Sequence, residues 1–184
     1  MIPSASQTVG PFFNYALTTD AGLGILARPG ALGQPIHITF RIIDGDGAPA
    51  PADALIELWQ ADAHGRYPHP LDPRAAEADP NFSGFGRLET SLDGTCTFAT
   101  VKPGRVGDQA PHISLAVFAR GLLKQLYTRL YFAGEAANAI DPVLALVPHE
   151  RRATLLAKPM PGQPNDWFFE IRLQGESETV FFDV

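Results

Sequence analysis

The sequence lacks several features that would identify its chemistry at once. It has a single cysteine, Cys96, so no disulfide can form within the chain and a cysteine-rich metal site is excluded. No apolar run approaches the roughly 18 residues that a membrane span needs. Positive charge is also scarce, since 14 lysines and arginines face 20 aspartates and glutamates, giving a net charge of −6. This balance argues against a partner that is a nucleic acid or a membrane.

Short catalytic motifs are missing as well. The sequence contains no GxSxG nucleophile motif, no GxxxxGK phosphate loop and no HExxH zinc motif. Its first residues, MIPSASQTVGPFF, lack a basic start followed by an apolar stretch. We therefore expect no secretory signal and a cytoplasmic location.

Glycine and proline are plentiful, at 17 each in 184 residues. The 45% hydrophobic content excludes disorder as the reason, so many turns and short elements are expected, which favours an all-β fold. The length fits one domain over residues 1–184. Within it, residues 1–35 show little periodicity and are predicted to form an irregular arm, with a β-sandwich core over 36–184.

Alternation of apolar residues predicts about seven short strands in the core. They lie at residues 36–43, 54–60, 96–101, 112–119, 125–132, 167–174 and 179–182. Residues 61–86 are predicted to be a loop. Helix is expected only late in the chain, as short segments around 143–146 and 149–156 that follow Pro142 and Pro148. This pattern predicts a β-sandwich.

Three residues could carry chemistry, and each has a structural alternative. His112 could ligate a metal, but position 114, which would share its strand face, is serine, so a hydrogen-bonded structural role is favoured. Tyr67 could supply a phenolate to ferric iron or simply pack its ring in a loop. Arg129 shares its strand face with Tyr127 and Tyr131, so it could bind a carboxylate or lie on a solvated face.

Motifs spread over almost the whole chain resemble the intradiol ring-cleavage dioxygenases. They are Ser6-Gln-Thr-Val-Gly-Pro11, Glu57-Leu-Trp-Gln-Ala-Asp62, Gly65-Arg-Tyr67, Thr100-Val-Lys-Pro-Gly104, Ala110-Pro-His-Ile-Ser114, Tyr127-Thr-Arg-Leu-Tyr-Phe132 and the ending Gln174-Gly-Glu-Ser-Glu-Thr-Val-Phe-Phe-Asp183. The resemblance implies an intradiol dioxygenase-like β-sandwich. It also implies a heteromer with a homologous beta subunit.

The resemblance further implies that this chain has lost an iron site. Iron-binding members of the family hold Fe(III) with two tyrosines and two histidines. Tyr67 and His112 match one ligand of each kind, whereas Val106 and Ser114 stand where the other two belong. Tyr67 and His112 are therefore expected to be relics, with no metal or other cofactor in this chain and Fe(III) in the beta subunit.

By the same resemblance, the chain completes the active site of that beta subunit. Arg129 and the arm residues Thr8, Gly10, Pro11 and Phe12 match positions that wall the partner's site and bind substrate. Phe12 stands where close relatives carry tyrosine. The implied reaction is cleavage of protocatechuate with O₂ to 3-carboxy-cis,cis-muconate, and this chain alone is expected to be inactive.

The alternative is a stand-alone β-sandwich module that binds an aromatic carboxylic acid without redox chemistry. The long arm favours the heteromer, because a free module has no need of a 35-residue lead-in. An iron enzyme acting by itself is disfavoured by Val106 and Ser114.

Overall fold

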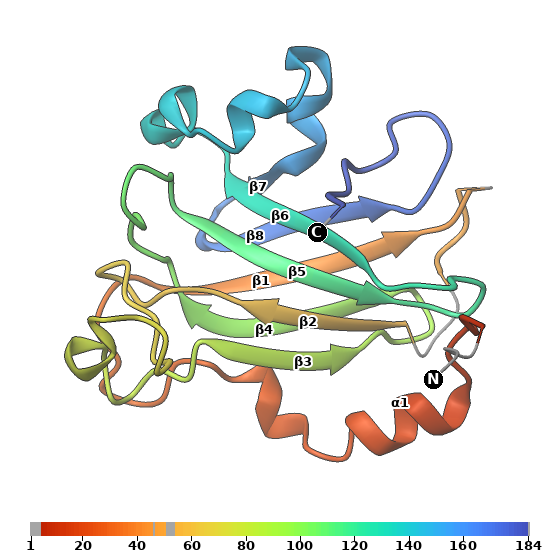
Figure 1. Ribbon diagram of the computed structural model, residues 1–184, viewed down its shortest axis with the longest axis horizontal. Helices are drawn as coiled ribbons and strands as arrows, with labels where there is room; N and C mark the ends of the chain where they lie inside the picture. Colours follow the sequence, from red (N-terminus) through yellow and green to blue (C-terminus); the bar gives the residue numbers. More distant parts are fainter. Residues whose placement is uncertain (1–4, 46, 51–53, 184) are drawn as a thin grey trace.

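The computed structural model describes residues 5–45, 47–50 and 54–183 and confirms the all-β prediction. Within these residues, eight strands form one sheet in the order β3-β2-β5-β6-β7-β8-β1-β4 (Figure 1). The strands are β1 (Pro35–Ile43), β2 (Leu55–Trp59), β3 (Phe85–Glu89), β4 (Thr95–Val101), β5 (His112–Phe118), β6 (Leu126–Phe132), β7 (Leu156–Met160) and β8 (Gln163–Arg172). Neighbours pair antiparallel, except for the parallel pairs β1 with β8 and β6 with β7.

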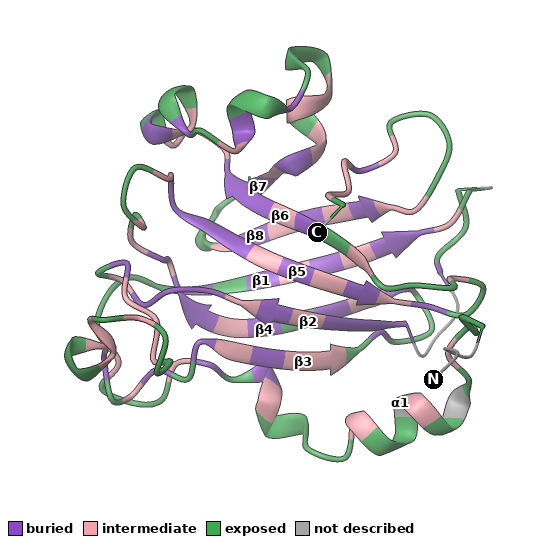
Figure 2. Cartoon of the chain, in the orientation of Figure 1, coloured by how far each residue is buried: buried purple, intermediate pink, exposed green. Residues whose placement is uncertain are grey.

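The sheet folds over on itself around one apolar core, as the β-sandwich prediction requires. Side chains alternate along each strand, so every second residue points inward. In β1 these inward residues are Ile36, Ile38, Phe40 and Ile42, at most 1% exposed, as their spacing predicts. Figure 2 shows the same alternation of buried and partly exposed residues along the other strands.

The end of the arm closes the seam between the two edge strands, β3 and β4. The backbone N–H of Leu26 donates to the carbonyl of Ala99 in β4 at 2.9 Å. The N–H of Ser83, just before β3, donates to the carbonyl of Leu26 at 3.0 Å. Gly86 in β3 leaves the room that Leu26 fills, since a Cβ there would lie 2.7 Å from its Cδ1. Leu26 is consequently fully buried.

A second, smaller core lies on the outer side of β5 and β6. Short 3₁₀ helices cover it: η3 (Ala136–Ile140), η4 (Leu144–Leu146) and η5 (His149–Leu155). Its buried members are Ala110, Tyr131, Ala137, Leu144, Val147 and Leu155. The predicted helical segments around 143–146 and 149–156 are thus present. Among the helices that the structure describes, none combines the length and apolar character needed to cross a membrane.

The structure corrects several predictions. The arm contains a helix, α1 (Pro11–Leu17), and a 3₁₀ turn, η1 (Ala21–Gly24), and the 61–86 region contains η2 (Ala75–Glu77), so helix is not confined to the end of the chain. Strands β3 and β7 were not predicted. The predicted strand 179–182 makes only a single bridge, between Phe182 and Tyr127.

Candidate functional site

Three neighbouring strands place the predicted site residues on one face of the sheet. In β5 the odd-numbered residues point into the main core, so His112 and Ser114 lie on the opposite face. Across the ladder, Ser114 pairs with Trp59 of β2 on one side and with Arg129 of β6 on the other. The register therefore gathers positions that are far apart in the sequence.

Tyr67 reaches this group from the loop after β2. Its ring stacks on Trp59, with centroids 5.5 Å apart and planes 11° apart. The carboxylate of Asp72 fixes the loop by accepting the Tyr67 N–H at 2.9 Å. Burial raises the pKa of the Tyr67 phenol, and the positive charge of Arg129 partly opposes that rise. The phenol is thus a neutral group within electrostatic reach of the guanidinium.

Arg129 is half-buried and held by its own chain. Its Nη1 donates to Oε1 of Gln109 at 2.7 Å. Gln109 itself belongs to a tight turn, in which its N–H donates to the carbonyl of Val106 at 3.0 Å. Burial raises the pKa of Tyr131 to about 12, while the adjacent Arg129 acts to lower it. The guanidinium therefore lies between β6 and the 106–109 turn.

His112 is buried and neutral. Its Nδ1 lies 2.8 Å from the carbonyl oxygen of Ala110, which can only accept, so Nδ1 carries the proton. Burial lowers the pKa of His112; the bond to Ala110 opposes this, and the charge of Arg129 adds to it. The ring also packs against Tyr131, with centroids 5.9 Å apart.

These residues do not fit a ferric ion. The described part of the chain holds no group of three or more histidine, cysteine, aspartate or glutamate side chains that could bind a metal. Val106 and Tyr67 line the same cavity of about 400 Å³, but Val106 offers no donor atom there. Ser114 likewise supplies a weak neutral oxygen where a strong ligand would be needed. The arrangement instead offers a fixed positive charge among aromatic rings.

The arm residues lie at another part of the surface. Thr8 Oγ1 accepts the N–H of Gly121 at 2.7 Å. Gly121 lies beyond the end of β5, seven residues after Ser114. The N–H of Phe13 donates to the carbonyl of Gly10 at 3.0 Å as α1 begins at Pro11, whose side chain lies outside what the structure describes. Phe12 is 85% exposed. Within this chain, the predicted substrate-binding residues therefore form two groups.

A groove along β6 connects these two groups. The section of the groove beside Arg129 has a volume of about 250 Å³. Its lining residues Tyr127, Phe182 and Asp183 also line the next section along the groove. That section shares Lys124 and Gln125 with a smaller hollow against the arm residues 7, 9 and 13. The C-terminal residues Phe181 and Phe182 thus form one wall of this groove.

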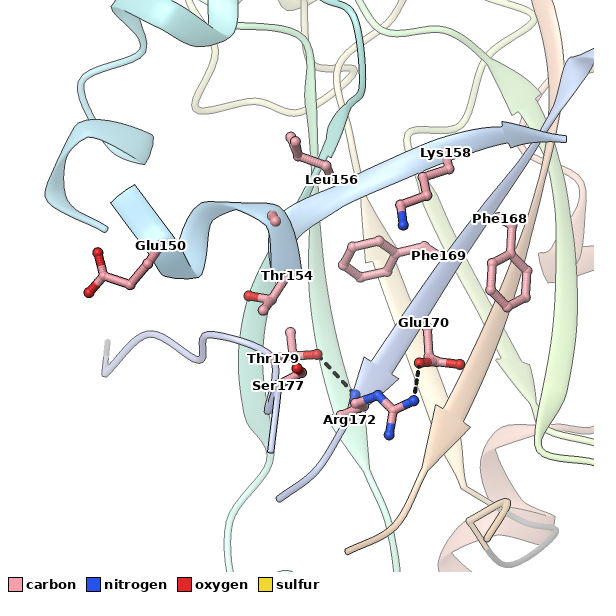
Figure 3. Close-up of a pocket in the computed structure, with 11 residues that line it drawn as sticks. Glu150, Thr154, Leu156, Lys158, Phe168, Phe169, Glu170, Arg172, Ser177 and Thr179 are labelled. Atoms are coloured by element: carbon pink, nitrogen blue, oxygen red, sulfur yellow. Dashed lines mark hydrogen bonds and ion pairs between the residues drawn. The ribbon is translucent and has the colours of Figure 1, made fainter. Parts of the chain in front are cut away.

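A different cavity, of about 440 Å³, lies between η5, β7, β8 and the C-terminal segment (Figure 3). Two cations, Lys158 and Arg172, line it. Arg172 is paired with Glu170 at 2.8 Å, and the Arg172 N–H donates to Thr179 Oγ1 at 2.9 Å. None of the residues predicted to act in a site lines this cavity.

Asp141, the residue before Pro142, supports the site and was not selected as a site residue from the sequence. Its buried carboxylate accepts four hydrogen bonds, from the N–H groups of Ala110, Val143 and Leu144 and from the Tyr131 hydroxyl, at 2.7 to 3.1 Å. An Asp-Pro pair gives the capping signal, but the long-range bonds depend on how β5, β6 and η4 pack.

The fold and this site define the class of protein. The family model described as Dioxygenase matches residues 9–175, and the chain belongs to the intradiol dioxygenase family. A solved dioxygenase domain from Streptomyces sp. SirexAA-E has the same fold, with a TM-score of 0.65 at 24% identity, covering 97% of this chain and all of that one. The 3-chlorocatechol 1,2-dioxygenase of Rhodococcus opacus 1CP gives a TM-score of 0.63 at 19% identity, covering 94% of this chain and 68% of that one.

Within the family, the similarity is strong to alpha chains. The chain is 46% identical to the protocatechuate 3,4-dioxygenase alpha chain of Burkholderia cepacia, over 97% of this chain and 96% of that one. It is 41% identical to the alpha chain of Pseudomonas putida, over 97% and 94% respectively. Identity to the protocatechuate 3,4-dioxygenase beta chain of Burkholderia cepacia is 34%, over 95% and 77%.

Proposed function

We propose that this chain is the non-iron alpha subunit of a protocatechuate 3,4-dioxygenase, which completes the active site of a homologous Fe(III)-bearing beta subunit. One observation carries the proposal: a guanidinium stands beside Tyr67 and His112, where the chain keeps only half of a ferric ligand set. The 46% identity to an alpha chain supports the same assignment. The beta subunit would supply the iron chemistry, in which both atoms of O₂ enter 3-carboxy-cis,cis-muconate.

Arg129 is the residue through which this chain would act on substrate. Protocatechuate carries a carboxylate, and a guanidinium can bind a carboxylate through two parallel hydrogen bonds. Gln109 occupies Nη1 of Arg129, and the side chain also lines the groove beside Tyr127. A fixed positive charge would orient the substrate acid without competing for the iron.

The arm would form a second wall of the partner's site. Thr8 anchors the arm to Gly121, and Phe12 beyond it is almost fully exposed. An apolar ring left in solvent favours burial against a partner. Gly10 and Pro11 would let the backbone pass close to a flat aromatic substrate.

Co-expression with and without the homologous beta chain tests the proposal. The two chains should purify together in equal amounts, with one iron per pair and ring-cleavage activity that the separate chains lack. Replacement of Arg129 by alanine should raise KM by about 10- to 100-fold, the value of one charge-assisted contact, with iron content unchanged. Arg129→Lys should show a smaller rise, because it keeps the charge but loses the paired donors.

The matched control is Arg28, an exposed arginine at the other end of the arm segment. Arg28→Ala should leave KM and iron content unchanged. Loss of assembly and iron in Arg129→Ala would show that Arg129 is structural. Tight binding of protocatechuate by the chain alone, with no affinity for the beta chain, would favour the stand-alone module.

A further inference from the structure

Arg129 lies between the two positions that lack a metal ligand. On one side it pairs directly with Ser114 across the β5–β6 ladder, on the same face of the sheet. On the other side its Nη1 is bound to Gln109, whose backbone closes a turn onto Val106. A side chain that connects these two places passes through the space between them.

The retained half of the site, Tyr67 and His112, lies within range of the charge of the same guanidinium. Tyr67 reaches the group by stacking on Trp59, which is the other neighbour of Ser114. His112 is two residues before Ser114 on the same face and packs against Tyr131, which faces the same way as Arg129. The nearby carboxylates have other partners: Asp72 accepts backbone N–H groups and the Arg74 side chain, and Asp141 accepts four donors.

We infer that the guanidinium of Arg129 takes the place of the metal ion in this pocket, so that the chain excludes iron by charge and volume as well as by its missing ligands. Arginine stays protonated in proteins, so this positive charge persists at any pH at which the protein is folded. A ferric ion would have to enter a space that already holds a cation fixed by Gln109. Restoring the two lost donors would therefore be insufficient on its own.

The test restores the ligands in the full-length chain, with and without the cation. V106Y/S114H is compared with V106Y/S114H/R129Q and V106Y/S114H/R129K, each incubated with Fe(III) and washed. Bound iron is measured by elemental analysis and by the visible phenolate-to-iron absorption. The R129Q triple variant should retain at least about tenfold more iron than the other two, since R129K keeps a charge in the same place.

A second pair of variants, with fewer substitutions, tests the inference even if the triple variants fail to fold. S114H and S114H/R129Q are titrated with Co²⁺, which the imidazoles at positions 112 and 114 could bind together, and folding is followed by circular dichroism. Co²⁺ absorption bands should appear only in S114H/R129Q. Equal metal binding with Arg129 present or replaced would overturn the inference, and so would an absence of binding in folded variants that lack Arg129.

Discussion

Replacement of Asp141 should be among the most damaging single changes outside the main core. The carboxylate is fully buried and accepts four hydrogen bonds that join the segment before β5, the strand β6 and the η4 turn. In Asp141→Ala, three backbone N–H groups and one phenol lose their acceptor. Each buried donor left unpaired costs about 1–3 kcal/mol, and partial entry of water reduces the sum, so we expect a loss of about 4 kcal/mol.

Asp141→Asn should lose about half as much, about 2 kcal/mol. The amide oxygen can replace Oδ1, which serves Val143, Leu144 and Tyr131, but the amide nitrogen would face the N–H of Ala110. Urea unfolding with a constant m-value measures both effects. The exposed Asp108 is the control, and Asp108→Ala should stay within about 0.5 kcal/mol of the parent. Losses below about 1 kcal/mol in both Asp141 variants would refute this account of the carboxylate.

Three further predictions concern other parts of the molecule. Gly65→Ala should lower the free energy of unfolding by about 3 kcal/mol or more in thermal or urea unfolding, because φ is 75° and a Cβ would clash with the Arg105 carbonyl oxygen. Gly107→Ala is the control: φ is 61° but the space around it is open, so the free energy of unfolding should fall by only about 1 kcal/mol. Burial lowers the pKa of His112 in the folded state, whereas the unfolded chain protonates this residue at its ordinary pKa. The free energy of unfolding should therefore fall as pH drops below about 6.5. The dependence on pH should be weaker in His112→Gln, and an unchanged dependence would contradict the burial argument. Burial raises the pKa of Cys96 to about 12, so a thiol reagent at pH 8 should react only after unfolding, and rapid labelling of the native chain would be the contrary result.

Strands with clean alternation were predictable from the sequence, and the others were not. In β1, apolar residues at every second position fix both the strand and its buried face, because the side-chain period of a strand is two. Gly84, just before β3, and Gly86 within it are residue types typical of a loop, yet Gly86 leaves the room that Leu26 fills. In β7, Pro159 weakens the strand pattern, and pairing with β8 decides its conformation.

The candidate site shows the same division. Sequence reasoning selected Tyr67, His112 and Arg129, and the structure brings all three together. Their meeting depends on the β2-β5-β6 register, which no local pattern encodes. Gln109 was not selected, since a glutamine in a loop carries no signal of the arginine that it holds. Whether Thr8, Gly10, Pro11 and Phe12 contact substrate remains a prediction that needs the assembled partner.

The burial of Leu26 between the edge strands limits where the arm can go. Because Leu26 is buried and hydrogen-bonded to β4, the arm is anchored to the sandwich at this residue. Deletions of the arm that include Leu26 would expose the main core. Deletions that end before Leu26 would only shorten the distance over which the arm can contact a partner. The described arm residues before Leu26, 5–25, would span at most about 70–75 Å if fully extended, and helix α1 shortens that distance, so the surfaces that these residues cover must lie close to this subunit.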